Sequence, residues 1–396
     1  MAIGVSSSFF RESVVYPGDA FGLDLAITWI DSVEHQELPF LQQRRTRLFA
    51  EQKQDAAMSG APIGGADRRL LGHDVDFFQD WTRHEEPGDR WWQPIDFGAA
   101  RTTIPPVSMV GGWYDIFAPQ QLTDFAAIQE AGRPARITIG PWHHSQVRAL
   151  LHMVADAVDH YQTVFDGGDV AGDKPVKLYL MGARTWRSFP HWPPPPRELR
   201  RLHLRPAGAL SAQPGSGDPT RFSYDPTDPT PAVGGRSLNN KRAGAKNQAA
   251  RERRHDVCCF STEPLTEQLV VIGTPSVNLT LRTTSAWADV FVRLCDVDAR
   301  GRSLNVCDTG IRLRPDTVRR DAEGRFTLEL TLSPTAFAFP PGHRVRLQVS
   351  GGAHPLINRN LGTGEPLRTG TRPATVQFEI YHDRKQHSFL TLPLVD

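Results

Sequence analysis

Cysteine is scarce in this sequence: there are four among 396 residues, all in the second half, and no two form a Cys-x-x-Cys pair. A disulfide-stabilised scaffold and a structural zinc site are therefore unexpected, and we expect the cysteines to be small buried side chains. No stretch approaches the roughly 18 consecutive apolar residues of a membrane span. The amino end also has no charged segment followed by an apolar one, so we expect a cytoplasmic protein without a membrane partner.

An excess of charge of either sign is also lacking. The 45 basic and 44 acidic residues leave a net charge of +1. This balance argues against the capture of nucleic acid or of an anionic membrane. Glycine and proline are plentiful instead, with 33 and 32 residues, and this favours a protein rich in turns and β-structure over a helical bundle.

Helical patterns occupy the sequence from about residue 21 to residue 97. Apolar residues cluster within 23–30, a second segment covers 40–54, and a third begins at Val75. The third segment and the Trp91-Trp92 pair after it are rich in aromatic residues. We expect these aromatics to pack in a core, and the alternative is that some of them line a substrate pocket.

Strands and helices then alternate up to about residue 181. Three short apolar runs predict buried strands at 107–110, 135–139 and 176–181, with helical segments between them. The second of these segments has its apolar residues on one side, namely Leu150, Leu151, Val154, Val158, Tyr161 and Phe165. This alternation is typical of βαβ units with a mainly parallel sheet.

From about Arg197 onward, short runs of alternating residues replace the helical pattern. Turn signals separate these runs, which predicts an antiparallel sandwich or jelly roll. The predicted strands are 269–272, 277–281, 290–294, 326–330, 345–349 and 376–380. Between Asp218 and Arg254 the sequence is first rich in proline and glycine and then basic. Because no aromatics interleave with these charges, we expect a solvated connecting loop and no nucleic-acid site.

Two polar motifs follow neighbouring predicted strands. Gly111-Gly112-Trp113-Tyr114-Asp115 comes directly after the first strand, and Gly140-Pro141-Trp142-His143-His144-Ser145 comes after the second. Functional groups gather at the carboxyl ends of strands in an open α/β sheet, so we expect Asp115 and one of the two histidines to face the same crevice. A carboxylate beside an imidazole fixes its tautomer while the ring acts as a general base. The alternative is that both residues only cap loops.

A metal site built from His143, His144, Asp115 and Asp89 is a competing interpretation. Two adjacent histidines on an extended segment point to opposite sides, so they do not readily bind one ion. We therefore expect no metal at these residues.

The two motifs resemble the acid and base motifs of a family of serine hydrolases, the cocaine esterase / X-Pro dipeptidyl-peptidase / α-amino-acid ester hydrolase family. The similarity continues through Pro175–Trp186 and Trp192–Pro194 and into segments of the predicted β region. Upstream, Tyr16–Phe21 and the stretch from Phe77 to Trp92 look like the helical cap of that family.

The resemblance implies an α/β plus all-β fold: a partial α/β-hydrolase domain with a helical cap, followed by a jelly-roll β-sandwich of the galactose-binding-like type. It divides the chain into a remnant of the hydrolase domain over 1–20, the cap over 21–97, the carboxyl-terminal half of the hydrolase domain over 98–196 and the jelly roll over 197–396. It also implies that Asp115 is the acid of a catalytic triad. The Pro-Trp-x-His pattern makes His144 the base and leaves His143 at a variable position. The implied partner is a small acyl ester or peptide substrate, cleaved through an acyl-enzyme. This chemistry needs neither a metal nor an organic cofactor, so we expect none.

The nucleophile expected for this family is missing from the sequence. The family's serine lies on a Gly-x-Ser-x-Gly elbow upstream of the cap, and no such motif occurs here. The nearest string is Gly4–Ser8, which lacks the closing glycine, so we expect Ser6, Ser7 and Ser8 to be ordinary loop or cap residues. Met1–Val5 reads as the end of a strand. We therefore expect the catalytic serine to lie outside this chain.

Three explanations fit this absence. The chain is part of a longer serine hydrolase, or it is the second half of a split enzyme whose first half supplies the serine, or it is a degenerate relative. In the last case it would be a binding or interaction protein that acts through the jelly roll. All three predict exposed apolar surface where the missing strands should pack.

Overall fold

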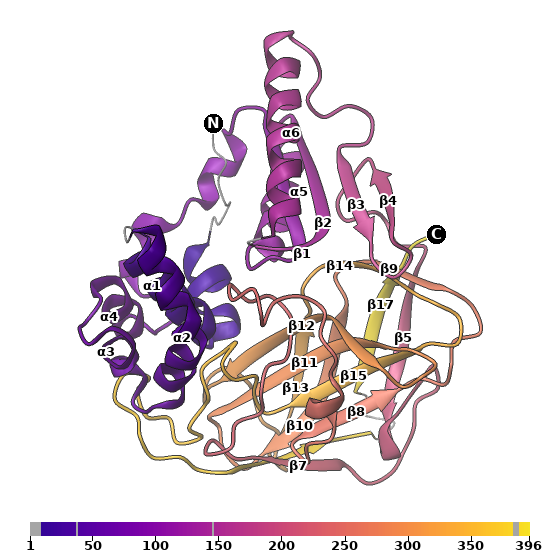
Figure 1. The fold of residues 1–396 in the computed structure, drawn as a ribbon. Coiled ribbons are helices and arrows are strands. Elements are labelled where there is room, and N and C mark those ends of the chain that lie inside the picture. The colour runs from indigo at the N-terminus through magenta and orange to yellow at the C-terminus, as the bar shows by residue number, and fades with distance from the viewer. Residues whose placement is uncertain (1–8, 37–38, 145, 383–387) are drawn as a thin grey trace.

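The computed structural model describes residues 9–36, 39–144, 146–382 and 388–396. Figure 1 shows a group of helices from the amino-terminal part, a small sheet with two helices, and a large β-structure from the second half of the chain. The strand predicted at Met1–Val5 and the residues Ser6–Ser8 lie outside the described residues. The division into four segments inferred from the resemblance stays a prediction.

The amino-terminal helices pack around aromatic side chains. Their bounds are α1 (Leu23–His35), α2 (Phe40–Ser59), α3 (Ala66–Leu71) and α4 (Asp76–Arg83), with short helical turns at Arg11–Val15, Pro17–Asp19, Ile63–Gly65, Arg90–Ile95 and Gly98–Thr102. Phe21 and Phe78 meet with their rings 5.8 Å apart, and Trp81 and Trp92 are buried in the same core. The expectation that the aromatics pack in a core is therefore confirmed for these residues.

The small sheet contains the predicted alternation of strands and helices. Its elements are β1 (Val107–Tyr114), α5 (Ala118–Glu130), β2 (Ala135–His143), α6 (Val147–Phe165), β3 (Val176–Leu180) and β4 (Thr185–Phe189). The strands lie in the order β1-β2-β3-β4, the first three are parallel, and β4 is antiparallel to β3. Within the described part of the chain, β1 pairs with β2 alone and forms one edge of the sheet.

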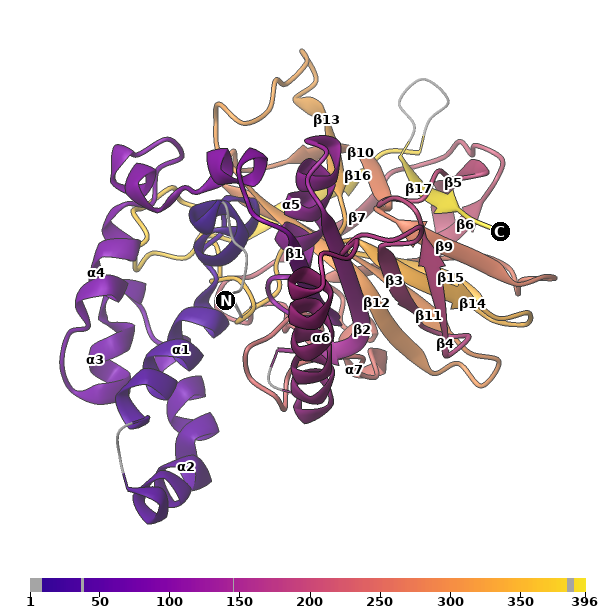
Figure 2. The ribbon, with the colours of Figure 1, turned by 90° about the horizontal axis from the view of Figure 1, so that it is seen from above.

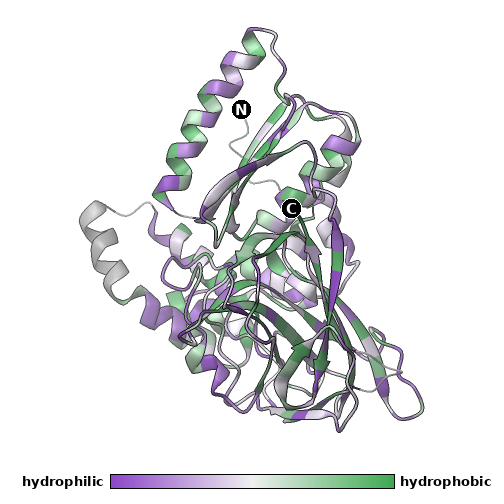
Figure 3. Cartoon of the chain, turned by 90° about the vertical axis from the view of Figure 1, so that its right-hand side faces the viewer, coloured by the Kyte–Doolittle hydropathy of each residue, from purple (hydrophilic) through white to green (hydrophobic). Residues whose placement is uncertain are grey.

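Helix α6 leaves its apolar side uncovered. It contacts β1 and β2, yet none of its described residues is buried, and it projects from the body of the molecule (Figures 1 and 2). Figure 3 shows hydrophobic and hydrophilic positions alternating along this helix. The exposed large apolar residues are Val147, Leu150, Leu151, Val154, Val158, Val164 and Phe165, which we call the α6 apolar row. This row fits the expected exposed apolar surface.

The second half of the chain forms the predicted antiparallel β-sandwich. Its strands are β5 (Glu198–Arg205), β6 (Ala209–Ser211), β7 (Thr220–Tyr224), β8 (Val257–Ser261), β9 (Leu269–Gly273), β10 (Ser276–Thr283), β11 (Ala288–Val297), β12 (Ser303–Leu313), β13 (Arg325–Thr331), β14 (Thr335–Phe339), β15 (Arg344–Ser350), β16 (Val376–Ile380) and β17 (Phe389–Leu394). Neighbouring strands are hydrogen-bonded in the order β12-β11-β15-β8-β6-β5-β17-β10-β16-β7. All six strands predicted here from alternating residues are confirmed.

One hydrophobic core joins the small sheet to the sandwich. Trp113, Ile137 and Leu178 of the small sheet belong to the same buried cluster as Phe337 and Leu347 of the sandwich. Met181 also pairs with Phe337 through a backbone bridge. The sandwich and the strands that carry the two polar motifs are therefore packed against each other in one core.

The basic stretch before Arg254 is only partly the solvated loop that the sequence suggests, since Lys241 and Arg253 are exposed but Arg251 is buried. Arg251, in the short helix α7 (Ala249–Glu252), is only 1% exposed and donates hydrogen bonds to Ser350 Oγ at 2.7 Å and to the carbonyl oxygen of Pro231 at 2.9 Å. Arg242 forms ion pairs with Asp24 and Asp55 of the helical region. For Arg242 and Arg251 the expectation was wrong, because the acceptors for these two charges come from other parts of the chain.

The cysteines are unpaired thiols. Cys295 and Cys307 are buried in the sandwich, and Cys258 and Cys259 are partly buried. Burial raises the pKa of Cys259 to about 11, so this thiol stays protonated at neutral pH. Among the described residues, no helix has the length and apolar character to cross a membrane.

The uncovered side of α6 makes a stability prediction. Leu151 of α6 is 65% exposed, whereas Leu122 of α5 is fully buried against the same sheet. We expect Leu151→Ala to change the free energy of unfolding by less than about 0.5 kcal/mol. The matched change Leu122→Ala should cost about 2–5 kcal/mol because it leaves a cavity. Urea unfolding followed by circular dichroism measures both, and equal losses would show that the α6 apolar row is covered in solution.

Candidate active site

The site forms where β1 and β2 end side by side. The two strands run in parallel register from the Val107–Ala135 pair to the Gly112–Gly140 pair, and the next matched pair is Tyr114 with His143. Strand β2 therefore has one more residue than β1 between these matches. Because of this bulge, Asp115 and His144 each come directly after a residue of the matched pair Tyr114–His143.

Two glycines make room for the bulge. A Cβ atom at Gly112 would lie 2.2 Å from the carbonyl oxygen of Trp142, and a Cβ at Gly140 would lie 2.5 Å from the Trp142 ring. A side chain does not fit at either position. The backbone of Trp142 comes too close to Gly112, and the indole ring of Trp142 comes too close to Gly140. The buried Trp142 thus occupies the space that side chains at these two positions would need.

Asp115 and His144, the two residues that the family resemblance points to, lie within hydrogen-bonding distance of each other. His144 Nδ1 lies 3.2 Å from Oδ1 and 3.3 Å from Oδ2 of Asp115. A second hydrogen bond holds the carboxylate, since the backbone N–H of Phe117 donates to its Oδ1 at 3.0 Å. A carboxylate carries no proton, so Nδ1–H is the donor to Asp115, and in the neutral ring Nε2 is left to accept a proton. This arrangement suits a general base.

The surroundings of His144 favour its protonated form. The hydrogen bond to Asp115 raises the pKa of His144 above its ordinary value, although partial burial acts in the opposite direction. The Phe117 ring packs edge-on against the imidazole with the centroids 5.3 Å apart. The side chain of His144 keeps 29% of its surface exposed, so the ring is held in place without being sealed from a reactant.

His143 lies in a different environment from His144. Its Nδ1 is buried and has no hydrogen-bond partner among the residues that the structure describes. Burial, and then the nearby charge of Lys246, lower the pKa of His143 below its ordinary value. The structure therefore brings His144, and not His143, together with Asp115.

An open crevice of about 460 Å³ lies between the ends of β1 and β2 and the 240–246 loop, and it is lined by the neighbours Tyr114 and His143 of the pair and not by Asp115 or His144 themselves. Its lining includes Tyr114, His143, Gln146, Tyr179, Arg184, Lys246 and Phe337. The loop residues of this crevice are not predictable from the sequence, because 220–250 carries no local signal of where it folds back. Phe117 was not predicted either, although an Asp followed two residues later by a backbone donor is a common turn pattern.

Asp89, the fourth residue of the competing metal interpretation, is engaged in the helical region. Its Oδ2 lies 2.8 Å from His84 Nδ1, and its Oδ1 accepts from the backbone N–H of Trp91 at 2.9 Å. The structure does not bring it to the Asp115–His144 pair. No group of three or more metal-ligating side chains is found in the described ranges.

Two family models match this chain. Residues 169–391 match the X-Pro dipeptidyl-peptidase C-terminal non-catalytic domain, and residues 1–146 match the X-Pro dipeptidyl-peptidase of the S15 family. The chain is also 27% identical over 433 aligned positions to cocaine esterase of Rhodococcus sp. (strain MB1 Bresler). That alignment covers 98% of this chain and 75% of cocaine esterase.

Solved structures share the fold. An α-amino acid ester hydrolase superposes with a TM-score of 0.70 at 24% identity, covering 84% of this chain and 63% of its own. An aminopeptidase from a marine sediment Thaumarchaeota archaeon superposes with a TM-score of 0.79 at 19% identity, covering 99% of this chain and 71% of its own. The chain thus spans less than two thirds of the ester hydrolase. The predicted fold class, an α/β-hydrolase part followed by a β-sandwich, is confirmed.

The pair makes a prediction about protonation. Replacing Asp115 by Asn removes the charge that the imidazolium faces, so the pKa of His144 should fall toward or below about 6.5. Titration of ¹³C-labelled histidines by NMR measures this change, with His143 as an internal reference of lowered pKa.

The same change should alter stability in a pH-dependent way. A raised pKa in the folded state stabilises the protein fully below the unfolded-state value and ceases to do so as the pH rises through the folded value. Asp115→Asn should therefore lower the melting temperature more at about pH 5.5 than at about pH 8.5. An equal loss at both pH values would contradict the ion pair.

Proposed function

Since this chain belongs to the X-Pro dipeptidyl-peptidase (S15) family of serine hydrolases, we propose that it supplies the acid and base of an acyl-transfer site that hydrolyses an ester or amide. One observation carries the proposal: His144 Nδ1 lies 3.2 Å from Asp115 Oδ1 at the carboxyl ends of two adjacent parallel strands. Asp115 would be the acid and His144 the base of the triad.

The chemistry divides between the two residues. His144 Nε2 takes the proton of a serine hydroxyl while the serine oxygen bonds to the acyl carbon of the substrate. The imidazolium then gives this proton to the departing alcohol or amine, which leaves an acyl-enzyme. A water molecule loses a proton to His144 and attacks the acyl carbon, and the serine leaves with that proton. Asp115 stays ionised throughout and stabilises the imidazolium.

We place the catalytic serine on polypeptide other than these 396 residues, in a longer protein or in a separate chain. The sequence has no Gly-x-Ser-x-Gly motif. Within the described residues, the α6 apolar row is exposed, and no strand lies on the outer edge of β1 in the sheet that carries the pair. A parallel strand added to β1 and an apolar helix laid on α6 would cover both surfaces. A serine carried by such a strand would approach from the β1 side.

We favour a small acyl ester as substrate over a peptide. The alignment with cocaine esterase covers 98% of this chain, whereas the S15 family model, named for a peptidase, matches residues 1–146. The four unpaired cysteines support a reducing compartment, in keeping with a cytoplasmic location.

The isolated chain offers a direct test. We expect it to hydrolyse p-nitrophenyl acetate no faster than its His144→Ala variant, because His144 has no serine to activate. His143→Ala serves as the matched control. If His144→Ala lowers the rate by about tenfold or more while His143→Ala does not, a nucleophile lies within these residues and our placement of the serine is wrong.

The genome that encodes this chain tests the same point independently. We expect a Gly-x-Ser-x-Gly motif, between a predicted strand and a predicted helix, either in frame upstream of Met1 or in a neighbouring gene. Stop codons upstream together with no such neighbour would instead favour a degenerate relative that binds through its jelly roll.

A further inference from the structure

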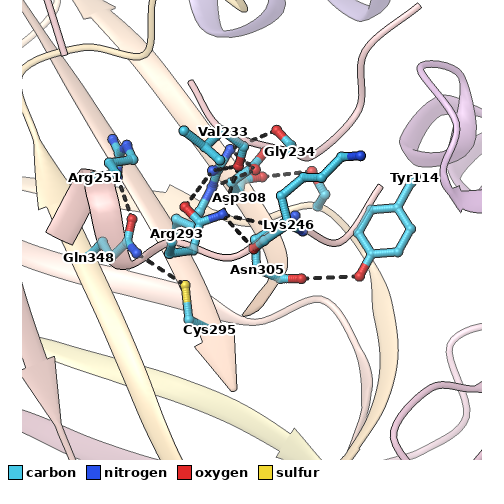
Figure 4. Close-up of polar contacts among 12 residues, drawn as sticks. Tyr114, Val233, Gly234, Lys246, Arg251, Arg293, Cys295, Asn305, Asp308 and Gln348 are labelled. Carbon is cyan, nitrogen blue, oxygen red and sulfur yellow. Dashed lines mark hydrogen bonds and ion pairs between the residues drawn. The ribbon is translucent and has the colours of Figure 1, made fainter. Parts of the chain in front are cut away.

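Tyr114 connects the Asp115–His144 pair to the sandwich. It is the last residue of β1, it immediately precedes Asp115, and it lies opposite His143 in the parallel pairing. Its hydroxyl donates to the backbone carbonyl oxygen of Asn305 in β12 at 3.1 Å, and both residues are buried (Figure 4). A single hydrogen bond thus joins the end of β1 to a strand 191 positions further along the chain.

Three hydrogen bonds hold the side chain of Asn305. Its Oδ1 accepts from the backbone N–H of Lys246 at 2.7 Å and from Gln248 Nε2 at 3.1 Å. Its Nδ2 donates to the carbonyl oxygen of Gly244 at 3.2 Å. The carbonyl that receives the Tyr114 hydroxyl therefore belongs to a residue whose side chain is fixed within the fold.

A buried charge stabilises this arrangement from the sandwich. Arg293 in β11 is fully buried, and its Nη2 lies 2.8 Å from Oδ2 of Asp308 in β12. The same guanidinium donates to Gln248 Oε1 at 3.0 Å, to the carbonyl of Gly234 at 3.2 Å and to that of Val233. Because Gln248 bonds both Arg293 and Asn305, the network is continuous from the Arg293–Asp308 ion pair to the Tyr114 hydroxyl (Figure 4).

We propose that Tyr114 is a positioning residue: its hydroxyl, anchored on Asn305, holds the end of β1 so that Asp115 meets His144. The β-sandwich, whose family model is described as non-catalytic, thereby sets the geometry of the pair. The functional meaning of this anchor rests on the proposed role of Asp115 and His144. Tyr114 touches no reacting atom and acts through its neighbour.

The chain contains a matched control for the test. Tyr224 of β7 is buried like Tyr114, but its hydroxyl has no hydrogen-bond partner within the described part of the chain. Tyr114→Phe and Tyr224→Phe therefore remove the same oxygen from two buried rings, and only the first removes the anchor.

The readout is the pKa of His144, measured by NMR titration of the ¹³C-labelled chain and assigned with His144→Ala. We expect Tyr114→Phe to move this pKa from its raised value toward about 6.5, and Tyr224→Phe to leave it unchanged. A lower melting temperature in Tyr114→Phe with an unchanged His144 pKa would show a purely structural hydrogen bond and overturn the proposal. So would equal titrations of the two variants.

Asn305→Ala is a second variant, which alters the sandwich side of the Tyr114–Asn305 hydrogen bond. It removes the side-chain bonds that hold the accepting carbonyl, so it should move the His144 pKa in the same direction, and an unchanged value would again overturn the proposal. The variant also keeps the test open if Tyr114→Phe does not fold. No substrate and no serine enter these titrations. An error in the proposed function appears in the ester assay, as hydrolysis that depends on His144, or in the genome, as the lack of a Gly-x-Ser-x-Gly partner, and either result leaves the titrations interpretable.

Discussion

The geometry of the site depends on the single extra residue in β2 between its matches with β1. Side chains alternate between the two faces of a strand, so a one-residue change in pairing reverses which face every later side chain occupies. The bulge sets Tyr114 opposite His143 and so makes Asp115 and His144 neighbours. It is accommodated because Gly112 and Gly140 leave space for Trp142. The pair is thus a consequence of strand pairing and of two missing side chains.

The sandwich retains charged residues where apolar ones would pack. A buried ion pair often contributes no more stability than apolar side chains of the same size. The Arg293–Asp308 pair instead fixes where neighbouring acceptors must lie, because each N–H of the buried guanidinium needs its own acceptor. Those acceptors are carbonyl and amide oxygens of 233–248. The charge therefore specifies the path of a segment that contains no helix or strand and ends directly before α7.

The sequence predicts the parts of this molecule that local patterns encode. Alternating residues mark the strands of the sandwich, and Asp115 and His144 are recognisable because each follows a predicted strand. The choice between His143 and His144 came from a family motif, and the hydrogen bond to Asp115 fits that choice. The burial of Arg251 and the bond from Tyr114 to Asn305 were not predictable, since each joins segments about 100 or more positions apart. Nothing near Arg251 in the sequence distinguishes it from the solvated arginines around it.

The bond from Tyr114 to Asn305 also bears on how such proteins can be recombined. A chimera that joined the small sheet of one relative to the sandwich of another would keep both hydrophobic layers and could still lose this bond. Successful exchanges should therefore transfer the 233–248 segment, β12 and the end of β1 as one unit. The functional border between the two regions then lies inside the sandwich, and the linker between their sheets is a poor place for a crossover.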